Sequence, residues 1–190
     1  SKSFKSFNLI VTTGNGPQVG ILMQRSELSK HSSKEGGLGY SVDMDICGAD
    51  TQGAIGHMFF VAYKNSIVKL NLAKQKLPSL ISMLTPVEVD RSDSAFIKPT
   101  KFVGLGYDTR QEADKAMKRE SWDGYEYYPQ TEKWRRLVAS PAPLKIESLN
   151  AIETLYNTGN FLLVCGIGGG VPYSIKKNKT IRREAAVIDK

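Results

Sequence analysis

Short apolar runs alternate along the chain with longer stretches of helical periodicity. Residues 9–11 and 161–165 are apolar runs of strand length, and each is followed directly by a glycine-rich turn. Between them, apolar residues recur at spacings of three and four, which indicates amphipathic helices. Strands that alternate with helices are typical of an α/β protein, so we expect a largely parallel sheet.

Two helices are predicted in the first third of the chain. Pro17 suits the first position of a helix that we expect to run through Glu27. A mobile loop over residues 32–40 then leads to a long helix. Each glycine in this helix lowers helix stability by about 1 kcal/mol relative to alanine, so we expect something to pack closely against the helix backbone there. This neighbour is either a ligand loop or, as we favour, a second subunit. The predicted buried stripe is Met44, Cys47, Thr51, Ile55, Met58 and Ala62, the second apolar edge is Phe59, Tyr63 and Ile67, and the glycines are Gly48, Gly53 and Gly56.

The middle of the chain differs in composition from both ends. A strand region over residues 80–89 is interrupted by Pro86, which predicts a strand ending near Thr85 and an extended connection after it. Residues 90–143 are rich in Lys, Arg, Tyr, Trp and Pro, with one short helix over 109–120. We expect a small lid subdomain there, between an N-terminal α/β part at 1–89 and a return to the α/β core at 144–190.

The last fifty residues return to the alternating pattern. Residues 140–143 are predicted to open a helix that Gly159 ends, followed by the strand at 161–165. Residues 173–175 and 180–182 then flank a basic tip and predict an exposed hairpin. Residues 185–190 have the apolar character of another strand. The apolar face of the predicted helix is Ile146, Leu149, Ile152 and Tyr156.

Composition narrows the class of protein. The chain has 190 residues, 41% of them apolar and 24% charged, as expected for one globular domain or a large piece of one. Two cysteines and two histidines supply neither a disulfide framework nor a four-thiolate zinc site, so no structural metal is expected. No apolar run spans a bilayer and no signal peptide opens the chain, which predicts a cytoplasmic protein. The net charge of +7 favours anionic partners.

The glycine turns are the first candidates for chemistry. Glycine lets backbone N–H groups converge, and a helix N-terminus adds a favourable field, so Gly14, Asn15 and Gly16 can hold an anion. Neither turn has the spacing of a dinucleotide fingerprint or a P-loop, and each taken alone could simply reverse the chain. Parallel strands bring both turns to one sheet edge, which favours binding. Lysines are the natural partners, with Lys98, Lys101 and Lys190 as candidates.

Three other groups of residues are candidates for chemistry or binding. A nucleophilic pair of Cys165 with His31 or His57 is rejected, because a buried strand cysteine is far commoner. Asp43 and Asp45 at a helix start are expected to be structural capping residues. The third group combines aromatic and basic residues, which either stack on the bases of single-stranded nucleic acid or pack against one another inside the lid. It consists of Trp134, Arg135 and Arg136 with Tyr125, Tyr127 and Tyr128.

Six motifs in the same order resemble carbamate kinases, over essentially the whole chain but only the middle of the family's sequence. They are residues 12–20 (TTGNGPQVG), 98–101 (KPTK), 134–136 (WRR), 140–141 (SP), 168–172 (GGGVP) and 186–190 (AVIDK). The family's opening glycine-rich turn and most of its nucleotide-binding half have no counterpart. The chain also lacks an initiator methionine, so we expect an incomplete chain.

The resemblance implies a fold and an activity. The fold would be the amino-acid kinase fold, a three-layer α/β sandwich around a mainly parallel sheet with a protruding lid. The activity would be reversible phosphoryl transfer between Mg-ATP and carbamate, giving ADP and carbamoyl phosphate in a homodimer, ATP-forming in arginine catabolism. The implied substrate-binding residues are Gly14, Asn15, Gly16, Gly169 and Gly170, and the implied catalytic residues are Lys101 and Lys190.

The chain departs from the family pattern at two positions that bear on the site. Thr13 stands where the family usually has histidine, and Ile167 interrupts a run of four glycines. A β-branched residue disfavours positive φ, so a shifted turn and altered substrate affinity are expected. Two alternatives stay open: another amino-acid kinase with a different carboxylate or phosphate acceptor, and a non-catalytic fragment that binds nucleic acid or a protein partner.

Overall fold

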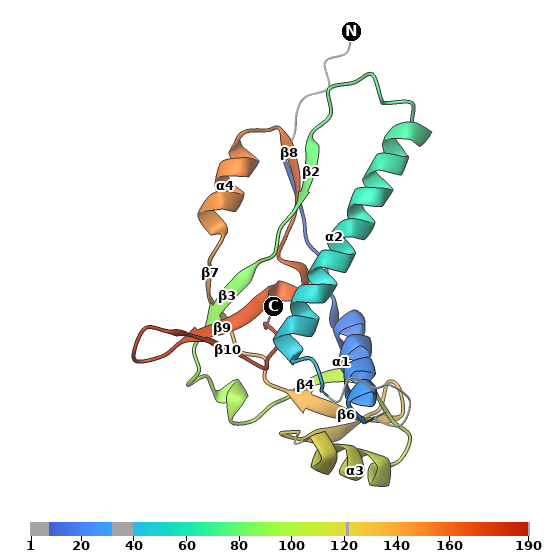
Figure 1. The fold of residues 1–190 in the computed structure, drawn as a ribbon, viewed down its shortest axis with the longest axis vertical. Helices are drawn as coiled ribbons and strands as arrows, with labels where there is room; N and C mark the ends of the chain where they lie inside the picture. Colours follow the sequence, from blue (N-terminus) through green and yellow to red (C-terminus); the bar gives the residue numbers. More distant parts are fainter. Residues whose placement is uncertain (1–7, 32–39, 121, 190) are drawn as a thin grey trace.

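A three-stranded parallel sheet lies at the centre of one half of the molecule. The computed structural model describes residues 8–31, 40–120 and 122–189. The sheet has the order β1–β8–β2, and both outer strands run parallel to β8 (Figure 1). The strands are β1 (Leu9–Val11), β8 (Phe161–Val164) and β2 (Ser79–Ser82).

Helices cover both faces of this sheet. On one face, helix α2 (Met44–Lys69) contributes Ile55 to a cluster with Val164 and Ile167. On the other, α4 (Leu149–Asn157) contributes Ile152 to a cluster with Leu163 and Cys165. Neighbouring residues of β8 therefore face opposite helices, as the period of two of a strand requires. The predicted three-layer α/β sandwich around a mainly parallel sheet is confirmed (Figure 1).

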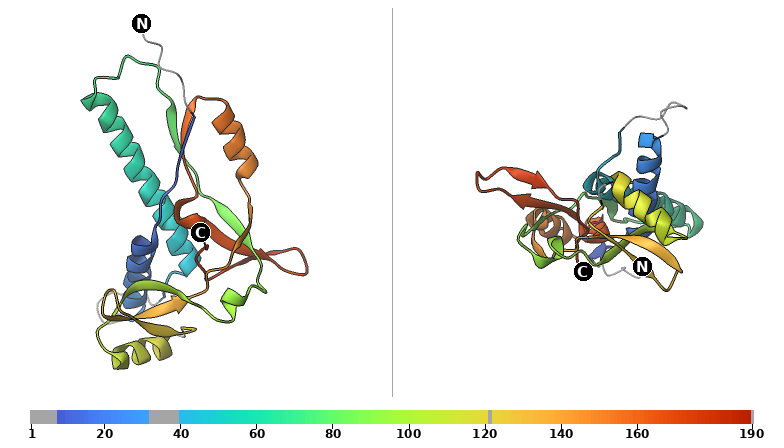
Figure 2. Two further views of the ribbon diagram at one scale, coloured as in Figure 1. Left: turned by 180° about the vertical axis from the view of Figure 1, so that it is seen from behind. Right: turned by 90° about the horizontal axis from the view of Figure 1, so that it is seen from below.

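A second sheet has the order β10–β9–β3–β7, in which only the β3–β9 pair is parallel. The hairpin of β9 and β10 projects from the body (Figures 1 and 2), and its prediction is confirmed. The helix predicted to open at 140–143 is wrong over its first part, because Ile146 pairs with Val87 in a strand and α4 begins only at Leu149. The strands are β3 (Pro86–Val89), β7 (Pro143–Ile146), β9 (Val171–Ile175) and β10 (Ile181–Arg183).

The chain between β2 and β3 passes from one sheet to the other at Thr85. The strand predicted to end near Thr85 ends three residues earlier, at Ser82, and the extended connection predicted after it is wrong, because residues 86–89 form strand β3. The Thr85 carbonyl accepts a hydrogen bond from the N–H of Val171, at 2.8 Å. Thr85 thus fixes the start of β9 directly after the second glycine turn.

An antiparallel sheet, β4–β6–β5, and helix α3 lie at the end of the molecule away from α4 (Figure 1). They fall within residues 90–143, where the lid was predicted. The aromatic side chains of this region pack on one another: the rings of Tyr125 and Tyr127 lie 5.8 and 5.5 Å from Trp134. The elements are η2 (Ser94–Phe96), β4 (Lys101–Tyr107), α3 (Arg110–Glu120), β5 (Tyr125–Tyr128) and β6 (Lys133–Val138).

Helix α1 (Gly16–His31) joins the two halves and runs past the Glu27 end that the sequence predicted. It packs between α2 and the lid sheet in one apolar cluster. That cluster consists of the buried residues Val19, Met23, Met44, Cys47, Val103 and Val138.

Helix α2 begins at Met44 as predicted, but its buried stripe is shorter than predicted. Met58 is 69% exposed and Ala62 is also exposed, so only the first half of the stripe meets the rest of the molecule. A Cβ on Gly56 would lie 1.9 Å from Ser82 Oγ, whereas Gly48 and Gly53 have no neighbour within 4 Å. The close neighbour predicted from the glycines is therefore strand β2, and only at Gly56.

Residues after β10 return toward the lid without forming the predicted strand. Ala186 makes a single parallel bridge to Ala139, and the N–H of Asp189 donates to the Pro141 carbonyl at 3.0 Å. Lys190 and nearly all of the predicted loop at 32–40 lie outside the described residues. In the part of the chain that the structure describes, no helix is long and apolar enough to cross a membrane.

Candidate active site

The two glycine-rich turns lie side by side at one edge of the parallel sheet. Because β1 and β8 are parallel neighbours, their carboxyl ends meet. The N–H of Gly168 donates to the Thr13 carbonyl at 2.8 Å, and Thr12 Oγ1 donates to the Gly166 carbonyl at 2.9 Å. The expectation that both turns share an edge is confirmed by these contacts.

Asn15 is the contact between the two turns. Its side chain is buried, and its Nδ2 donates to Thr51 Oγ1 on α2 at 2.9 Å. An added Cβ on Gly168 would lie 2.1 Å from Asn15 Oδ1, and Gly168 has a φ of +69°. Only glycine satisfies both the space and the backbone conformation at position 168.

Polar side chains that the sequence analysis missed hold the second turn in place. Gln52 Nε2 donates to the Ile167 carbonyl at 2.8 Å, and Gln52 Oε1 accepts from the N–H of Thr85 at 3.0 Å. Thr85 Oγ1 then accepts from the N–H of Gly166 at 2.8 Å. The sequence signal for this network is Gln52 beside Thr51 on a buried helix face, because buried polar groups need partners.

The hydrogen-bond donors of the two turns differ in availability. The N–H groups of Gly169 and Gly170 donate within their own turn, to the carbonyls of Gly166 and Ile167, at 3.0 and 3.2 Å. In contrast, no acceptor in the described part of the chain takes the N–H of Gly14 or Asn15. These two donors lie directly before α1, where the helix field also favours an anion. The first turn is the better candidate for holding a phosphate or carboxylate.

Ile167 is accommodated in the second turn without a strained backbone. Its side chain is fully buried and packs with Ile55 and Val164. The left-handed positions fall on glycines, at 166, 168, 169 and 170. The premise of a β-branched residue at positive φ is therefore wrong, and a shift of the turn relative to the family stays a prediction.

Of the two lysines implied as catalytic, the structure describes only Lys101. Lys101 is exposed at the first position of β4, where it pairs with Val138. Lys190 lies outside the described residues, but the preceding Asp189 is bonded to Pro141. No hydrogen bond or ion pair between Lys101 and either glycine turn is present among the described residues.

The cysteines offer no nucleophile. Burial, with the nearby Asp50 carboxylate, raises the pKa of the Cys47 thiol to about 11, and burial also raises the pKa of Cys165. Both thiols are therefore protonated at neutral pH, and a thiolate is the reactive form. The rejection of a cysteine hydrolase stands.

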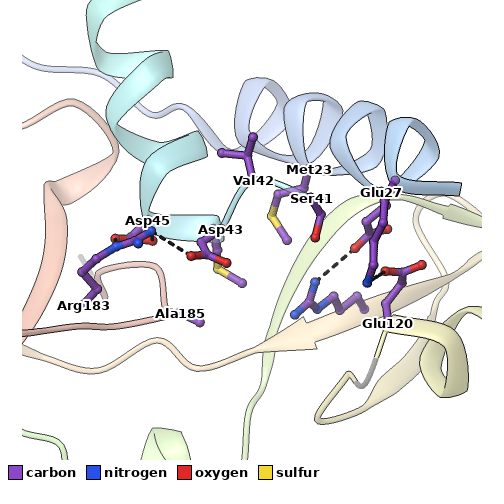
Figure 3. Close-up of a pocket in the computed structure, with 12 residues that line it drawn as sticks. Met23, Glu27, Ser41, Val42, Asp43, Asp45, Glu120, Arg183 and Ala185 are labelled. Atoms are coloured by element: carbon purple, nitrogen blue, oxygen red, sulfur yellow. Dashed lines mark hydrogen bonds and ion pairs between the residues drawn. The ribbon is translucent and has the colours of Figure 1, made fainter. Parts of the chain in front are cut away.

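Asp43 and Asp45 lie at the start of α2 as expected, at the N-cap position and in the first turn. Asp43 makes no capping hydrogen bond with its side chain. Instead, Arg183 donates two hydrogen bonds to Asp45, at 2.6 and 2.7 Å, and lies 3.0 Å from Asp43 (Figure 3). The pair attaches the end of β10 to the start of α2.

A cavity of about 300 Å³ lies between the end of α1, the start of α2 and strand β6 (Figure 3). Its lining is charged, but the charges are paired: Glu27 with Arg136 at 3.3 Å, and Lys30 with Glu120 at 3.5 Å. Burial raises the pKa of Glu27, which Arg136 opposes. None of the described residues predicted for the site lines this cavity, so it is separate from the glycine turns.

The relatives found by sequence are carbamate kinases, while no family model matches the chain. Carbamate kinase from Staphylococcus haemolyticus is 35% identical over 187 residues, which is 98% of this chain and 56% of that protein. Carbamate kinase from Rhizobium meliloti is 38% identical over 184 residues, or 96% of this chain and 51% of that protein. The chain thus spans about half the length of the curated relatives it matches.

Solved structures give the same result. Carbamate kinase from Giardia lamblia bound to citric acid has a TM-score of 0.78 and 34% identity, over 96% of this chain and 54% of that one. The same enzyme bound to AMP-PNP has a TM-score of 0.76 over the same shares. Sequence, fold and motif order thus agree that this chain is similar to carbamate kinases along nearly its whole length, while it spans about half of each of them.

Proposed function

We propose that the protein carrying this chain is a carbamate kinase, which transfers a phosphoryl group reversibly between carbamoyl phosphate and ADP. The P–O bond to carbamate breaks and a new P–O bond to ADP forms, giving ATP and carbamate. The observation that carries this proposal is the similarity to carbamate kinases over 96–98% of the chain, joined to the two unused N–H donors at the first turn. Arginine catabolism would supply the carbamoyl phosphate.

The proposed roles follow from where charge must be held. Phosphoryl transfer depends mainly on positioning and on neutralising charge on the moving group. Gly14, Asn15 and Gly16 would hold the phosphoryl or carbamate oxygens with backbone N–H groups at the start of α1. Lys101 would neutralise the acceptor from the lid, and Lys190 would face the transferring phosphate.

The second turn has a modified role in this proposal. Gly169 and Gly170 would line the site, but their N–H groups already have acceptors within the turn. They would contact a ligand through the close approach that glycine allows rather than as primary donors. The support for this arrangement is the contact of Gly168 with Asn15, which keeps the second turn against the first.

ATP or ADP is the proposed nucleotide, supported by the AMP-PNP complex of the Giardia lamblia enzyme. We propose that it is used as its Mg²⁺ complex. The described residues contain no group of three or more His, Cys, Asp or Glu side chains that fits a metal ion, so they do not form a protein cage for Mg²⁺. Mg²⁺ usually binds substrate phosphates with few protein ligands.

A coupled assay tests the reaction. The complete protein, supplied with ADP and carbamoyl phosphate, is expected to form ATP, and acetyl phosphate as a replacement should give little product. No ATP at millimolar substrate would contradict the proposal. Faster reaction with another acyl phosphate would instead indicate another amino-acid kinase.

The role of Lys101 can be tested separately. Lys101→Met is expected to lower kcat by about 100-fold, because one positioned charge in a phosphoryl-transfer site contributes about 3 kcal/mol. Lys98→Met, on the exposed loop before β4, is the matched control and should retain activity. An unchanged rate in Lys101→Met would remove this lysine from the mechanism.

A homodimer in the cytoplasm completes the proposal. The second half of α2 carries exposed apolar residues, among them Met58 at 69%, Val61 at 41% and Val68 at 76%. Such a row on one helix is typical of an interface. Val61→Asp should convert a dimer to a monomer in sedimentation velocity, and a wild-type monomer would contradict the dimer.

A further inference from the structure

One face of helix α1 packs against several elements of the lid. Residues spaced by four and three along this face contact successive lid elements. Met23 packs with Val103 of β4. Glu27 accepts hydrogen bonds from Arg136 of β6 and from Trp122 Nε1, both at 3.3 Å. The lid therefore sits on the helix that begins at the first glycine turn.

The tightest of these contacts joins two backbones. Gly20 lies on the same face, one turn before Met23, and an added Cβ would be 2.7 Å from both the N and Cα atoms of Gly104. Gly104 has a φ of +76° and lies where the register of β4 against β6 shifts. Helix and strand thus touch without side chains between them, and Val19, Met23 and Val103 pack beside the contact.

This contact lies between the two parts of the proposed site. Gly20 is four residues after Gly16, or about 6 Å along a helix that rises 1.5 Å per residue. Gly104 is three residues after Lys101, or about 10 Å along a strand that rises about 3.3 Å per residue. Helix α1 is continuous from Gly16 to Gly20, and residues 101–103 pair regularly with β6 up to the contact, so the contact constrains the distance from the first turn to Lys101.

We propose that the Gly20–Gly104 backbone contact is a positioning contact that sets how far Lys101 stands from the turn at residues 14–16. The inference rests on the proposed carbamate kinase activity. A methyl group at position 20 must move β4 by about 0.7 Å to reach the ordinary contact distance of 3.4 Å. A displacement of about 1 Å in a catalytic group can cost about 100-fold in rate.

The test compares two Gly→Ala changes in helices of the complete protein. Gly20→Ala is expected to lower kcat by about 10- to 100-fold while the KM for ADP stays within about twofold. Gly53→Ala is the matched control, because Gly53 lies in α2 with nothing within 4 Å of an added Cβ. Its kcat should not change. An unchanged kcat in Gly20→Ala, or an equal loss in Gly53→Ala, would overturn the positioning role.

A double-mutant cycle separates positioning from general damage to the fold. If Gly20 acts through Lys101, Gly20→Ala should add less than about twofold to the loss in Lys101→Met. Losses that multiply would overturn the proposal. Should Gly20→Ala not fold, Gly104→Ala serves instead: its Cβ meets open space, so it strains the same strand through positive φ alone.

Hydrogen exchange provides a readout that does not need activity. Amides of residues 101–107 should exchange at least about fivefold faster in Gly20→Ala and at the wild-type rate in Gly53→Ala. Unchanged exchange would overturn the contact itself. A wild-type protein that forms no ATP would overturn the proposed function and the catalytic role of Lys101, whereas an active wild type with an unaffected Gly20→Ala would overturn only the positioning contact.

Discussion

The two glycine-rich turns meet at one sheet edge but use glycine for different reasons. In the second turn, positions 166, 168, 169 and 170 all have positive φ, and a side chain at 168 would overlap Asn15. In the first turn, neither Gly14 nor Gly16 has a positive φ, and an added Cβ on Gly16 meets open space. The second turn needs glycine for its backbone conformation, whereas the backbone conformation at Gly14 and Gly16 does not require it.

The two turns also differ in whether their backbone N–H groups have acceptors. In the second turn the N–H groups of the four glycines at 166, 168, 169 and 170 all have acceptors, within the turn or on Thr85 and Thr13. The first turn leaves the N–H groups of Gly14 and Asn15 without an acceptor among the described residues. An unused donor beside open backbone is what a ligand site requires. Substitutions of glycine in the second turn should therefore act on stability, and substitution of Gly16 in the first turn should act on binding.

Gly168→Ala in the second turn is expected to have the largest effect on stability. Positive-φ strain and overlap with Asn15 should together lower the free energy of unfolding by about 3 kcal/mol. Urea denaturation followed by circular dichroism measures this. Gly124→Ala, a loop glycine with nothing within 4 Å, is the control and should change little. Equal stability of the two variants would show that the second turn does not require glycine.

Gln52→Leu should have the next largest effect. It leaves the Ile167 carbonyl and the Thr85 N–H without their partners, at a cost of about 2–3 kcal/mol in the free energy of unfolding. Gln111→Leu on the exposed face of α3 is the matched control. A loss below about 0.5 kcal/mol for Gln52→Leu would show that the buried network does not hold the second turn.

Asn15→Ala tests the contact between the turns. Loss of the hydrogen bond to Thr51 and a small cavity should lower the free energy of unfolding by about 1–2 kcal/mol. Combined with Gly168→Ala, it should relieve the overlap, so the double variant should be about 1 kcal/mol more stable than the sum of the two losses predicts. Simple additivity would indicate that the turns do not press on each other.

Gly16→Ala should have the smallest effect on stability, within about 0.5 kcal/mol in the free energy of unfolding, because the position has space and no strained φ. Its affinity for carbamoyl phosphate should nevertheless fall about tenfold, since the methyl group fills the space beside the backbone. Isothermal titration measures the affinity. Unchanged binding with lost stability would reverse the assignment of the two turns.

The elements that depend on local pattern were predictable. The stripe that begins at Met44 placed the start of α2, and the apolar run ending at Cys165 placed β8 and its turn. The helix predicted to open at residues 140–143 and to end at Gly159 was right only over its second part, because the stretch holding Ile146 adds a strand beside β3. Local spacing cannot distinguish such a strand from a helix start, since its partner is more than fifty residues away in sequence.

For the site, the sequence by itself determined the two turns and, through parallel strands, their common edge. Only the tertiary structure decided what surrounds them: the bond from Asn15 to Thr51, the bridge of Gln52 to Thr85 and the contact of Gly20 with Gly104. The physical reason is the separation in sequence over which each kind of interaction acts. Strand and turn propensities act between neighbours in sequence, whereas buried polar partners and backbone contacts depend on how whole elements pack.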